Sequence, residues 1–203
     1  SLLKSLPKRE IICGYGEILK HALISHSKNF KFIDINKDKI LNLESPFIEK
    51  AILESCRIKK NVVEKDEKEN NLRKILNFGH TFAHAYEAAK GYSKKLNHGE
   101  AVILGIESAV KFSYQFNILK KEQLDKVINH IRSLNLKLKI SKFFIKKDVN
   151  KIVNFMRLDK KNNSPNINLI LLKKIGKPVI NLNYKINKIT FFLKSNLAEW
   201  YLD

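Results

Sequence analysis

Apolar residues recur at helical spacing over much of the chain. In residues 123–134 they fall three or four positions apart, at Leu124, Val127, Ile128, Ile131 and Leu134. Residues at this spacing share one face of a helix. Similar patterns predict helices over residues 10–24, 46–63, 77–90 and 98–116 and around residues 149–156. The segment 98–116 is apolar or small over most of its girth, which is typical of a buried helix.

The pattern changes near the C-terminus, where two short apolar runs lie on either side of a turn. Residues 167–172 and 179–182 flank Gly176-Lys177-Pro178, and this arrangement predicts a β-hairpin. We interpret residues 187–201 as a helix and the charged and amide-rich residues 65–71 as a loop. The predicted fold class is mainly α: a multi-helix domain with a small β-hairpin near the C-terminus, spanning residues 1–203 as one domain.

Local signals refine the ends of the predicted helices. Ser45 before Pro46 is a typical helix start, with proline at the first helical position. Gly91 is expected to end the helix over residues 77–90. The run Cys13-Gly14-Tyr15-Gly16 is interpreted as a tight turn that opens the first helix. It is not a dinucleotide-binding fingerprint, because no strand-like run precedes it and the third glycine is absent.

The composition adds a strong positive charge to this picture. The 203 residues are 44% hydrophobic, which suits one globular domain, and the formal net charge is +19. One explanation is binding to nucleic acid or to an anionic surface. The other is that lysine fills ordinary surface positions. The basic residues are spread along the whole chain, which favours the second explanation, and an anionic small-molecule substrate fits both. We expect no nucleic-acid partner.

The cysteines and the apolar runs indicate the compartment. Cys13 and Cys56 form no CxxC motif, and we interpret them as reduced thiols of a cytoplasmic protein. No apolar run reaches the roughly 18 residues that a membrane helix needs, and no signal peptide is visible. The expectation is therefore a chain without a membrane partner. Because Ser1 is not an initiator methionine, the protein's own beginning need not be Ser1.

Three histidines supply the strongest chemical signal. His80 and His84 lie four apart on a predicted helix, and His98 opens the next helix just before Gly99. Two imidazoles on one face, with a third nearby and a carboxylate from elsewhere, are the material of a transition-metal site. The segment is not an HExxH zinc-hydrolase motif, because Thr81 occupies the position of the general base. A surface pair or buried core imidazoles are the alternatives. Gly99 would let another chain segment approach closely.

Glu17 and Lys20 share a face of the first helix, which by itself indicates only an exposed ion pair of little energetic value. Together with the histidines, they belong to a longer series of motifs: Glu17-Ile18-Leu19-Lys20-His21, Lys59 with Val62-Val63 and Asp66-Glu67, Leu72-Arg73, Leu76-Asn77-Phe78-Gly79-His80-Thr81-Phe82, His84-Ala85, His98-Gly99-Glu100-Ala101-Val102 and Asp159-Lys160-Lys161. In these motifs and in their order, the chain resembles the 3-dehydroquinate synthase family over residues 2–180. The one small departure is Ala83, where the family often has glycine.

This resemblance implies an enzyme of the shikimate pathway. Family members convert a seven-carbon keto-sugar acid phosphate (DAHP) to 3-dehydroquinate and phosphate, using NAD and a divalent metal, usually zinc, with cobalt as the alternative. They join an N-terminal α/β domain that binds NAD to a C-terminal helical domain, and this chain resembles only the second. The resemblance implies a homodimer for the complete enzyme. We expect the isolated chain to be inactive, because hydride transfer needs NAD.

Carried over residue by residue, the family's metal ligands match Glu17, His80 and His98. In this assignment His80 and His84 do not bind one ion together, and His84 matches a substrate-site histidine near the phosphate. The residues that hold the substrate's carboxylate, hydroxyls and phosphate match Lys20, Lys59, Arg73 and Asn77. Lys160 is expected to add another anion contact, with Lys161 as the alternative. We expect the cations to line the metal-bearing cleft, with Glu69 as a partner when no substrate is bound.

Two other functions stay open at the level of the sequence. A sibling sugar-phosphate cyclase would share the fold and use another seven- or six-carbon phosphate. His84 argues against the valiolone-forming branch, which typically loses this histidine. A non-catalytic basic helical module would have no need of the set Glu17, His80 and His98. It would instead show a basic face with interleaved aromatic residues, a pattern that the sequence lacks.

Overall fold

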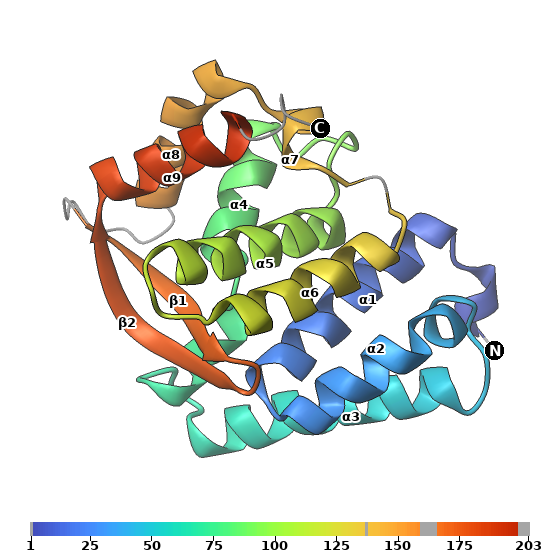
Figure 1. Ribbon diagram of the computed structural model, residues 1–203. Helices are drawn as coiled ribbons and strands as arrows, with labels where there is room; N and C mark the ends of the chain where they lie inside the picture. Colours follow the sequence, from blue (N-terminus) through green and yellow to red (C-terminus); the bar gives the residue numbers. More distant parts are fainter. Residues whose placement is uncertain (1, 137, 159–165, 199–203) are drawn as a thin grey trace.

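The computed structural model describes residues 2–136, 138–158 and 166–198. It shows helices packed around a central helix, with a two-stranded hairpin along one side (Figure 1). No helix within the described ranges is both long and apolar enough to cross a membrane. With η marking 3-10 helices, the elements are η1 (Leu2–Ser5), α1 (Lys8–Ile24), α2 (Ser27–Leu41), α3 (Phe47–Lys65), η2 (Leu72–Asn77), α4 (His80–Ala89), α5 (His98–Gln115), α6 (Lys121–Ser133), α7 (Ile140–Phe143), η3 (Lys146–Asp148), α8 (Val149–Leu158), β1 (Asn166–Lys174), β2 (Lys177–Lys185) and α9 (Ile186–Ala198).

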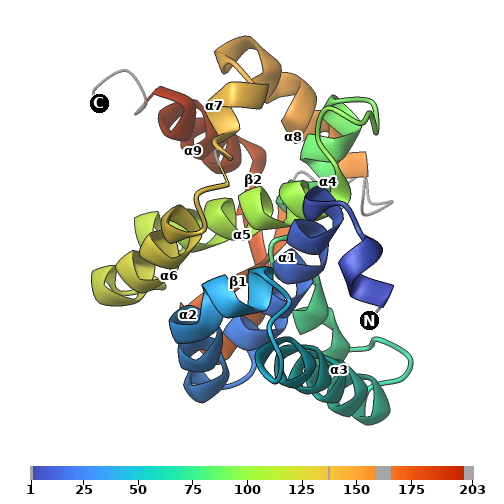
Figure 2. The same cartoon turned by 90° about the vertical axis from the view of Figure 1, so that its right-hand side faces the viewer.

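Helix α5 lies at the centre of the fold. It packs against α1, α4, α6 and β1, and Figure 2 shows it crossing the middle of the molecule. Most of its residues are buried, which confirms the prediction from its apolar girth. Its start is fixed by a capping box: the Asn97 side chain accepts from the Glu100 N–H, and the Glu100 carboxylate accepts from the Asn97 N–H.

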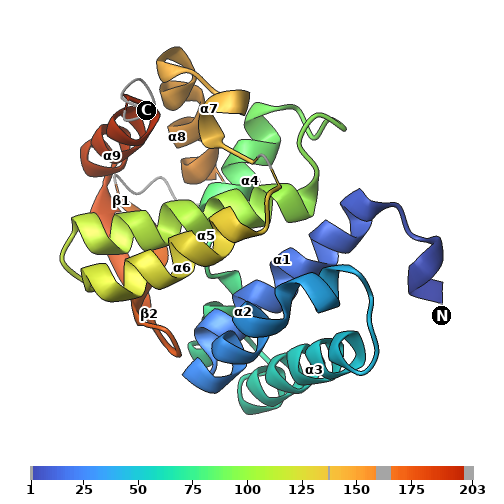
Figure 3. The ribbon, with the colours of Figure 1, turned by 45° about the vertical axis from the view of Figure 1, so that its right-hand side comes forward.

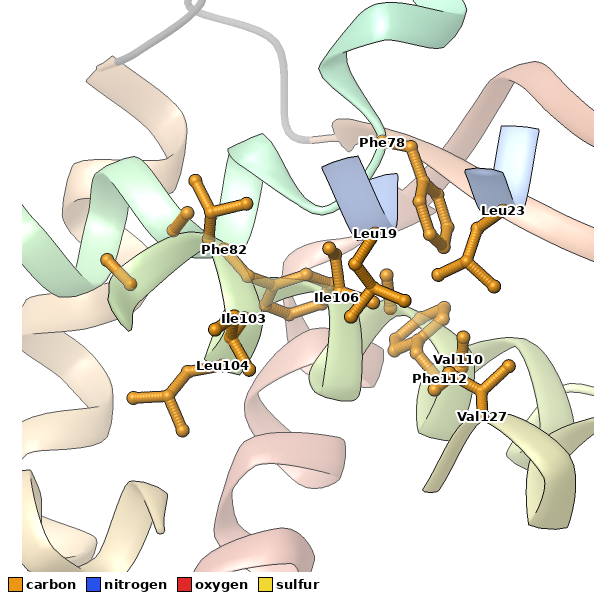
Figure 4. Close-up of a cluster of buried hydrophobic side chains, with 14 of the residues drawn as sticks. Leu19, Leu23, Phe78, Phe82, Ile103, Leu104, Ile106, Val110, Phe112 and Val127 are labelled. Carbon is orange, nitrogen blue, oxygen red and sulfur yellow. The ribbon is translucent and has the colours of Figure 1, made fainter. Parts of the chain in front are cut away.

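The hydrophobic core surrounds α5 and joins the helices that carry the site. Phe82 from α4, Phe112 from α5 and Val127 from α6 are buried side chains in this core, as is Leu19 from α1 (Figure 4). A close-packed interior tolerates little relative movement of its elements. Side chains carried by α1, α4 and α5 are therefore held on a rigid support.

Helices α2 and α3 pack against each other and against α1 (Figure 3). The hydrophobic pattern predicted α3 but not α2. Asn36 has non-helical dihedral angles (φ −107°, ψ 15°) inside α2, and residues 36–39, between the buried Ile33 and Ile40, are all polar, so the apolar pattern is missing for one turn. Helix α3 begins at Phe47, one residue later than predicted, because Pro46 occupies the N-cap position. It continues to Lys65, so the predicted loop begins at Asp66.

The prediction that a glycine-containing turn opens the first helix is wrong. Cys13, Gly14 and Gly16 all lie inside α1, which starts at Lys8. Gly16 instead lies where α1 crosses α5, and its lack of a side chain lets the two helices approach closely. A Cβ added there would lie 3.0 Å from the Gly99 carbonyl oxygen, and a Cβ at Gly99 would lie 2.0 Å from the Cys13 Cα. The backbones of α1 and α5 therefore touch, as the sequence argument for Gly99 expected.

The helix predicted over residues 77–90 is shorter than expected. Residues 72–77 form η2, and α4 begins at His80. Gly79 separates the two with φ +78°, a conformation that L side chains rarely adopt, and a Cβ there would lie 2.9 Å from the Ile106 nitrogen. The break makes His80 the first residue of α4. The predicted stop at Gly91 is confirmed, because Gly91 follows α4 with φ +66°.

The predicted hairpin is confirmed and is longer than the sequence indicated. Strands β1 and β2 are antiparallel, with Leu169 opposite Leu182 and an irregularity in register after this pair. Ile167, Leu169 and Leu171 are buried, and alternate residues face the other way. Helix α9 confirms the helical interpretation of residues 187–198. Residues 199–201 of that prediction lie outside the described residues.

Candidate metal centre

Three helices bring Glu17, His80 and His98 together. Glu17 lies on α1, His80 is the first residue of α4, and His98 is the first residue of α5. Each offers one ligand atom, and these atoms all lie within 4.8 Å of one another. The Glu17 Oε1 lies 3.5 Å from the His80 Nε2. In a closed tetrahedral zinc site, ligand atoms lie about 3–3.5 Å apart, and the distance between Glu17 and His80 falls within this range.

One oxygen of Glu17 is left for a cation. Its Oε1 is buried and has no hydrogen-bond partner among the described residues. A buried, unsatisfied carboxylate oxygen is costly, and a metal ion would satisfy it. One carboxylate and two imidazoles also form a donor set typical of catalytic zinc, which keeps a position open for substrate. The residues present therefore fit a divalent ion.

Lys20 holds the other Glu17 oxygen. The Lys20 Nζ donates to Glu17 Oε2 over 2.8 Å, and the Lys20 side chain is only 5% exposed. Burial raises the pKa of Glu17, but the charge and hydrogen bond of Lys20 outweigh it and lower the pKa overall. The pKa of Lys20 is lowered by burial and by Lys59, against the attraction of Glu17. The alternative of an exposed ion pair is thus wrong.

His80 is held in the form that binds metals. Its Nδ1 lies 3.3 Å from the Phe78 carbonyl oxygen, while its Nε2 faces Glu17. Burial, and next the charge of Lys20, lowers the pKa of His80 to about 4. The ring is therefore neutral at pH 7, and a neutral imidazole is the ligating form. The charge of the nearby Lys20 thus disfavours protonation of His80, and the neutral ring stays available as a ligand.

The remaining histidine stands beside the other two. The His84 ring centroid lies 5.3 Å from that of His80 and 6.4 Å from that of His98. His84 and His80 line a cavity of about 610 Å³, together with Asn77. The Asn77 side-chain NH2 donates to Glu69 Oε1 over 2.7 Å. Glu69 therefore pairs with an amide, which corrects the prediction that it pairs with the cations.

The other predicted substrate residues lie at different places. Lys59 is on α3, where its charge acts on Lys20. Arg73 is in η2, and its guanidinium donates to the Glu67 carbonyl over 2.6 Å. Among the described residues, the cavity lining includes Lys74 and Arg157 but not Lys20, Lys59 or Arg73. Lys160, and with it Lys161, lies outside the described residues.

One wall of the cavity was not predicted from the sequence. The hairpin supplies four amides to the lining, at alternate positions of its two strands: Asn166, Asn168, Asn181 and Asn183. The signal was present as polar residues alternating with apolar ones along both runs. Without the tertiary structure, such residues are indistinguishable from the solvent face of an ordinary hairpin.

A helical domain that presents one carboxylate and two imidazoles beside a polar cavity defines a candidate metal-dependent enzyme domain. A family model described as 3-dehydroquinate synthase C-terminal matches residues 14–162. The chain therefore belongs to the 3-dehydroquinate synthase family, as a C-terminal domain.

The curated relatives agree with this membership. A 3-dehydroquinate synthase from Pelagibacter ubique is 56% identical over 199 residues, which cover 98% of this chain and 54% of the relative. A 3-dehydroquinate synthase from Thermodesulfovibrio yellowstonii is 38% identical over 179 residues, covering 88% of this chain and 49% of the relative. The chain thus spans about half the length of the curated relatives it matches.

Solved structures share the fold at lower sequence identity. A 2-epi-5-epi-valiolone synthase from Streptomyces hygroscopicus, with NAD+ and Zn2+ bound, has a TM-score of 0.81 at 21% identity and covers 97% of this chain and 53% of its own. A 2-deoxy-scyllo-inosose synthase, complexed with carbaglucose-6-phosphate, NAD+ and Co2+, has a TM-score of 0.76 at 25% identity and covers 94% of this chain and 52% of its own. This chain therefore shares its fold with one part of each of these two synthases.

Proposed function

We propose that this chain is the metal- and substrate-binding part of an enzyme that converts DAHP to 3-dehydroquinate and phosphate in the shikimate pathway. The observation that carries the proposal is the convergence of Glu17, His80 and His98 around an unpartnered, buried carboxylate oxygen. Membership of the 3-dehydroquinate synthase family gives this donor set its chemical context.

The proposed cofactors are a divalent metal and NAD. Two structural relatives were solved with NAD+, one with Zn2+ and the other with Co2+. A divalent ion at Glu17, His80 and His98 would make a bound substrate hydroxyl more acidic, which favours hydride transfer to NAD. NAD would be held mainly by an N-terminal domain, which we propose as the partner of this chain.

The chain's own residues would bind and neutralise the substrate. Lys20 keeps Glu17 ionised while its charge remains close to the ligands. His84 and Asn77 border the cavity next to His80, where they can donate hydrogen bonds to phosphate or hydroxyl oxygens. Arg73 and Lys59, with Lys160, would supply charge for the carboxylate and phosphate groups. Arginine suits bidentate binding of these anions, and lysine acts as a point charge.

A sibling cyclase activity is the second candidate, because two solved structures with this fold are named as synthases of other products, 2-epi-5-epi-valiolone and 2-deoxy-scyllo-inosose. The sequence comparison favours the first candidate, since the relatives at 56% and 38% identity are 3-dehydroquinate synthases. Substrate choice therefore has to be measured directly.

The test is an assembled enzyme. We would join this chain to the N-terminal half of the Pelagibacter ubique relative, load the fused protein with zinc and NAD, and measure phosphate release. We expect release from DAHP and little from other seven- and six-carbon sugar phosphates. The chain alone should release none. Turnover by the isolated chain, or preference for another sugar phosphate, would contradict the proposal.

Two variants of the assembled enzyme separate catalysis from simple basicity. Arg73→Ala should reduce kcat/KM for DAHP by about 100-fold, as expected when one bidentate anion contact is lost. Lys121→Ala is the control, because Lys121 is exposed on α6 and paired with Asp125. A basic nucleic-acid module would show the reverse: Lys121→Ala would weaken duplex binding with a steep salt dependence, and Arg73→Ala would not.

A further inference from the structure

One of the three candidate ligands is held differently from the others. The His98 side chain is 54% exposed, whereas that of His80 is 12% exposed. Its Nδ1 lies 3.2 Å and 3.1 Å from the two carboxylate oxygens of Glu87. The Glu87 side chain is itself only 12% exposed and comes from the last turn of α4. A nearly buried carboxylate is thus aimed at the exposed ligand.

The chemistry of this pair fixes the His98 ring. An ionised carboxylate can only accept hydrogen bonds, so the Nδ1 must carry the proton and donate it. A neutral imidazole has one N–H, so the Nε2 keeps its lone pair. An exposed ring would otherwise sample several rotamers and both tautomers. The contact with Glu87 selects one tautomer and one orientation.

We propose that Glu87 is a positioning residue of the metal centre, which sets the tautomer and direction of His98 so that its Nε2 serves the metal. This inference rests on the proposed function of Glu17, His80 and His98 as ligands. Carboxylates that hold the second nitrogen of a ligating histidine raise the affinity of many metal sites. Glu87 has the burial and the distance for that role.

A second device holds the backbone of the same ligand. Arg9 donates from Nε and Nη2 to the two Glu100 oxygens over 2.8 and 2.6 Å, and from Nη1 to the Lys94 carbonyl over 2.6 Å. Glu100 also caps α5 two residues after His98. The clamp ties the first turn of α5 to the start of α1. Glu87 therefore only has to orient the ring, because the backbone is already placed.

The test is equilibrium zinc binding by this chain, measured by competition with a chromophoric chelator. Glu87→Ala should weaken zinc binding by about 10- to 100-fold, the range known for such partners. Glu87→Gln keeps an acceptor oxygen, so its zinc affinity should lie between those of the wild type and Glu87→Ala. Glu107→Ala is the matched control: Glu107 is 14% exposed and pairs with Lys111 on α5. Its zinc dissociation constant should change less than about threefold, because it touches no ligand.

A second readout separates positioning from general stability. In metal-free protein, the nitrogen resonances of the His98 ring should show the Nδ1–H form in the wild type and a tautomer mixture in Glu87→Ala. Wild-type zinc affinity in a folded Glu87→Ala variant would overturn the inference. The metal centre itself is tested separately with His80→Ala. If zinc binding is as strong in this variant as in the wild type, the result would overturn both the metal centre and the role of Glu87.

The amide wall of the cavity supports a separate inference. Asn168 on β1 lies opposite Asn183 on β2, and both line the cavity that also holds Asn77 and His84. The chain has 39 lysines and arginines, yet the hairpin lines this cavity with side chains that both donate and accept. We infer that this wall binds the hydroxyl groups of a polyhydroxylated substrate and so helps to select it. The inference rests on the proposed function.

Its test uses the assembled enzyme. Asn168→Leu and Asn183→Leu should each raise KM for DAHP at least tenfold, while inhibition by inorganic phosphate stays unchanged, because phosphate has no carbon chain to reach the wall. Asn154→Leu, an exposed position on α8, is the control. Unchanged KM in both hairpin variants would overturn the inference, as would equal weakening of phosphate inhibition. Failure of the proposed function would appear instead as a wild type that does not turn over DAHP.

Discussion

The crossing of α1 and α5 and the segment 66–77 are built in opposite ways. At the crossing, Gly16 and Gly99 let two backbones touch, and a Cβ at Gly99 would lie 2.0 Å from the Cys13 Cα. In the segment, one carboxylate supplies the order. Asp66 accepts from the backbone N–H groups of Asn70, Asn71 and Arg73 over 2.9, 2.8 and 2.9 Å. The first region is buried, whereas residues 67–72 of the second are exposed.

The difference shows how each part of the site is placed. Candidate ligands Glu17 and His98 lie next to the glycines of the crossing, so rigid packing sets their separation. Arg73, a candidate substrate contact, depends on hydrogen bonds at the surface. Surface hydrogen bonds open and close more readily than a packed core. The four predictions below test this contrast, from the largest expected effect to the smallest.

Gly99→Ala should have the largest effect. The new Cβ would overlap the α1 backbone at Cys13, which cannot rotate away, so α1 and α5 must separate. We expect a loss of at least about 3 kcal/mol in the free energy of unfolding, the upper range for overpacking. Urea unfolding monitored by circular dichroism measures it. An unchanged unfolding midpoint would show that the crossing adapts and that the contrast is false.

His21→Gln should change how stability depends on pH. His21 is buried on α1, with its Nδ1 2.6 Å from the Ser55 Oγ, and burial and then Lys20 lower its pKa from 6.5 to about 4. As the pH falls, His21 therefore binds a proton in the unfolded chain before it does so in the folded chain. The stability it contributes is complete above pH 6.5 and is lost as the pH falls through about 4. The loss is on the order of 3 kcal/mol, at 1.36 kcal/mol for each pKa unit.

Thermal unfolding of metal-free protein between pH 7.5 and pH 4 measures this effect. The wild type should lose stability steeply over this window, and His21→Gln should lose less. His26→Gln is the control, because His26 is exposed before α2. Parallel curves for wild type and His21→Gln would refute the prediction.

Gly14→Ala should have a small effect of opposite sign. Gly14 lies inside α1, and a Cβ added there would meet no atom of the described residues within 4 Å. Alanine favours a helix interior over glycine by about 1 kcal/mol. We expect a gain of that size in the same urea experiment. A loss of stability would mean that this face of α1 contacts something outside the described residues.

Asp66→Asn should have the smallest effect on global stability. The pKa of Asp66 is lowered, first by the Arg73 backbone N–H and also by that of Asn71, so the ionised form is the one that holds the segment. Hydrogen exchange of the Asn70, Asn71 and Arg73 amides should become faster, while the unfolding midpoint stays nearly constant. Unchanged exchange would show that other contacts order this segment.

The sequence by itself determined most of the helices and the hairpin. The spacing of Leu124, Val127 and Ile131 defined α6, and the apolar girth of residues 98–116 defined the buried α5, because burial of one face requires a matching period. It failed at α2, where residues 36–39 are all polar and leave one turn of the helix without an apolar residue. It also placed the start of α4 too early, because the break at Gly79 depends on contact with α5.

The candidate site divides in the same way. The spacing of His80, His84 and His98 indicated metal chemistry, but no spacing rule connects them to Glu17, which entered through the family resemblance alone. Only the tertiary structure brings Glu17 beside His80 and His98, gives His98 its partner Glu87, and turns alternate asparagines of a hairpin into a cavity wall. The physical reason is that local periodicity fixes which face of an element is buried, whereas contacts between distant elements depend on how closely their backbones can approach.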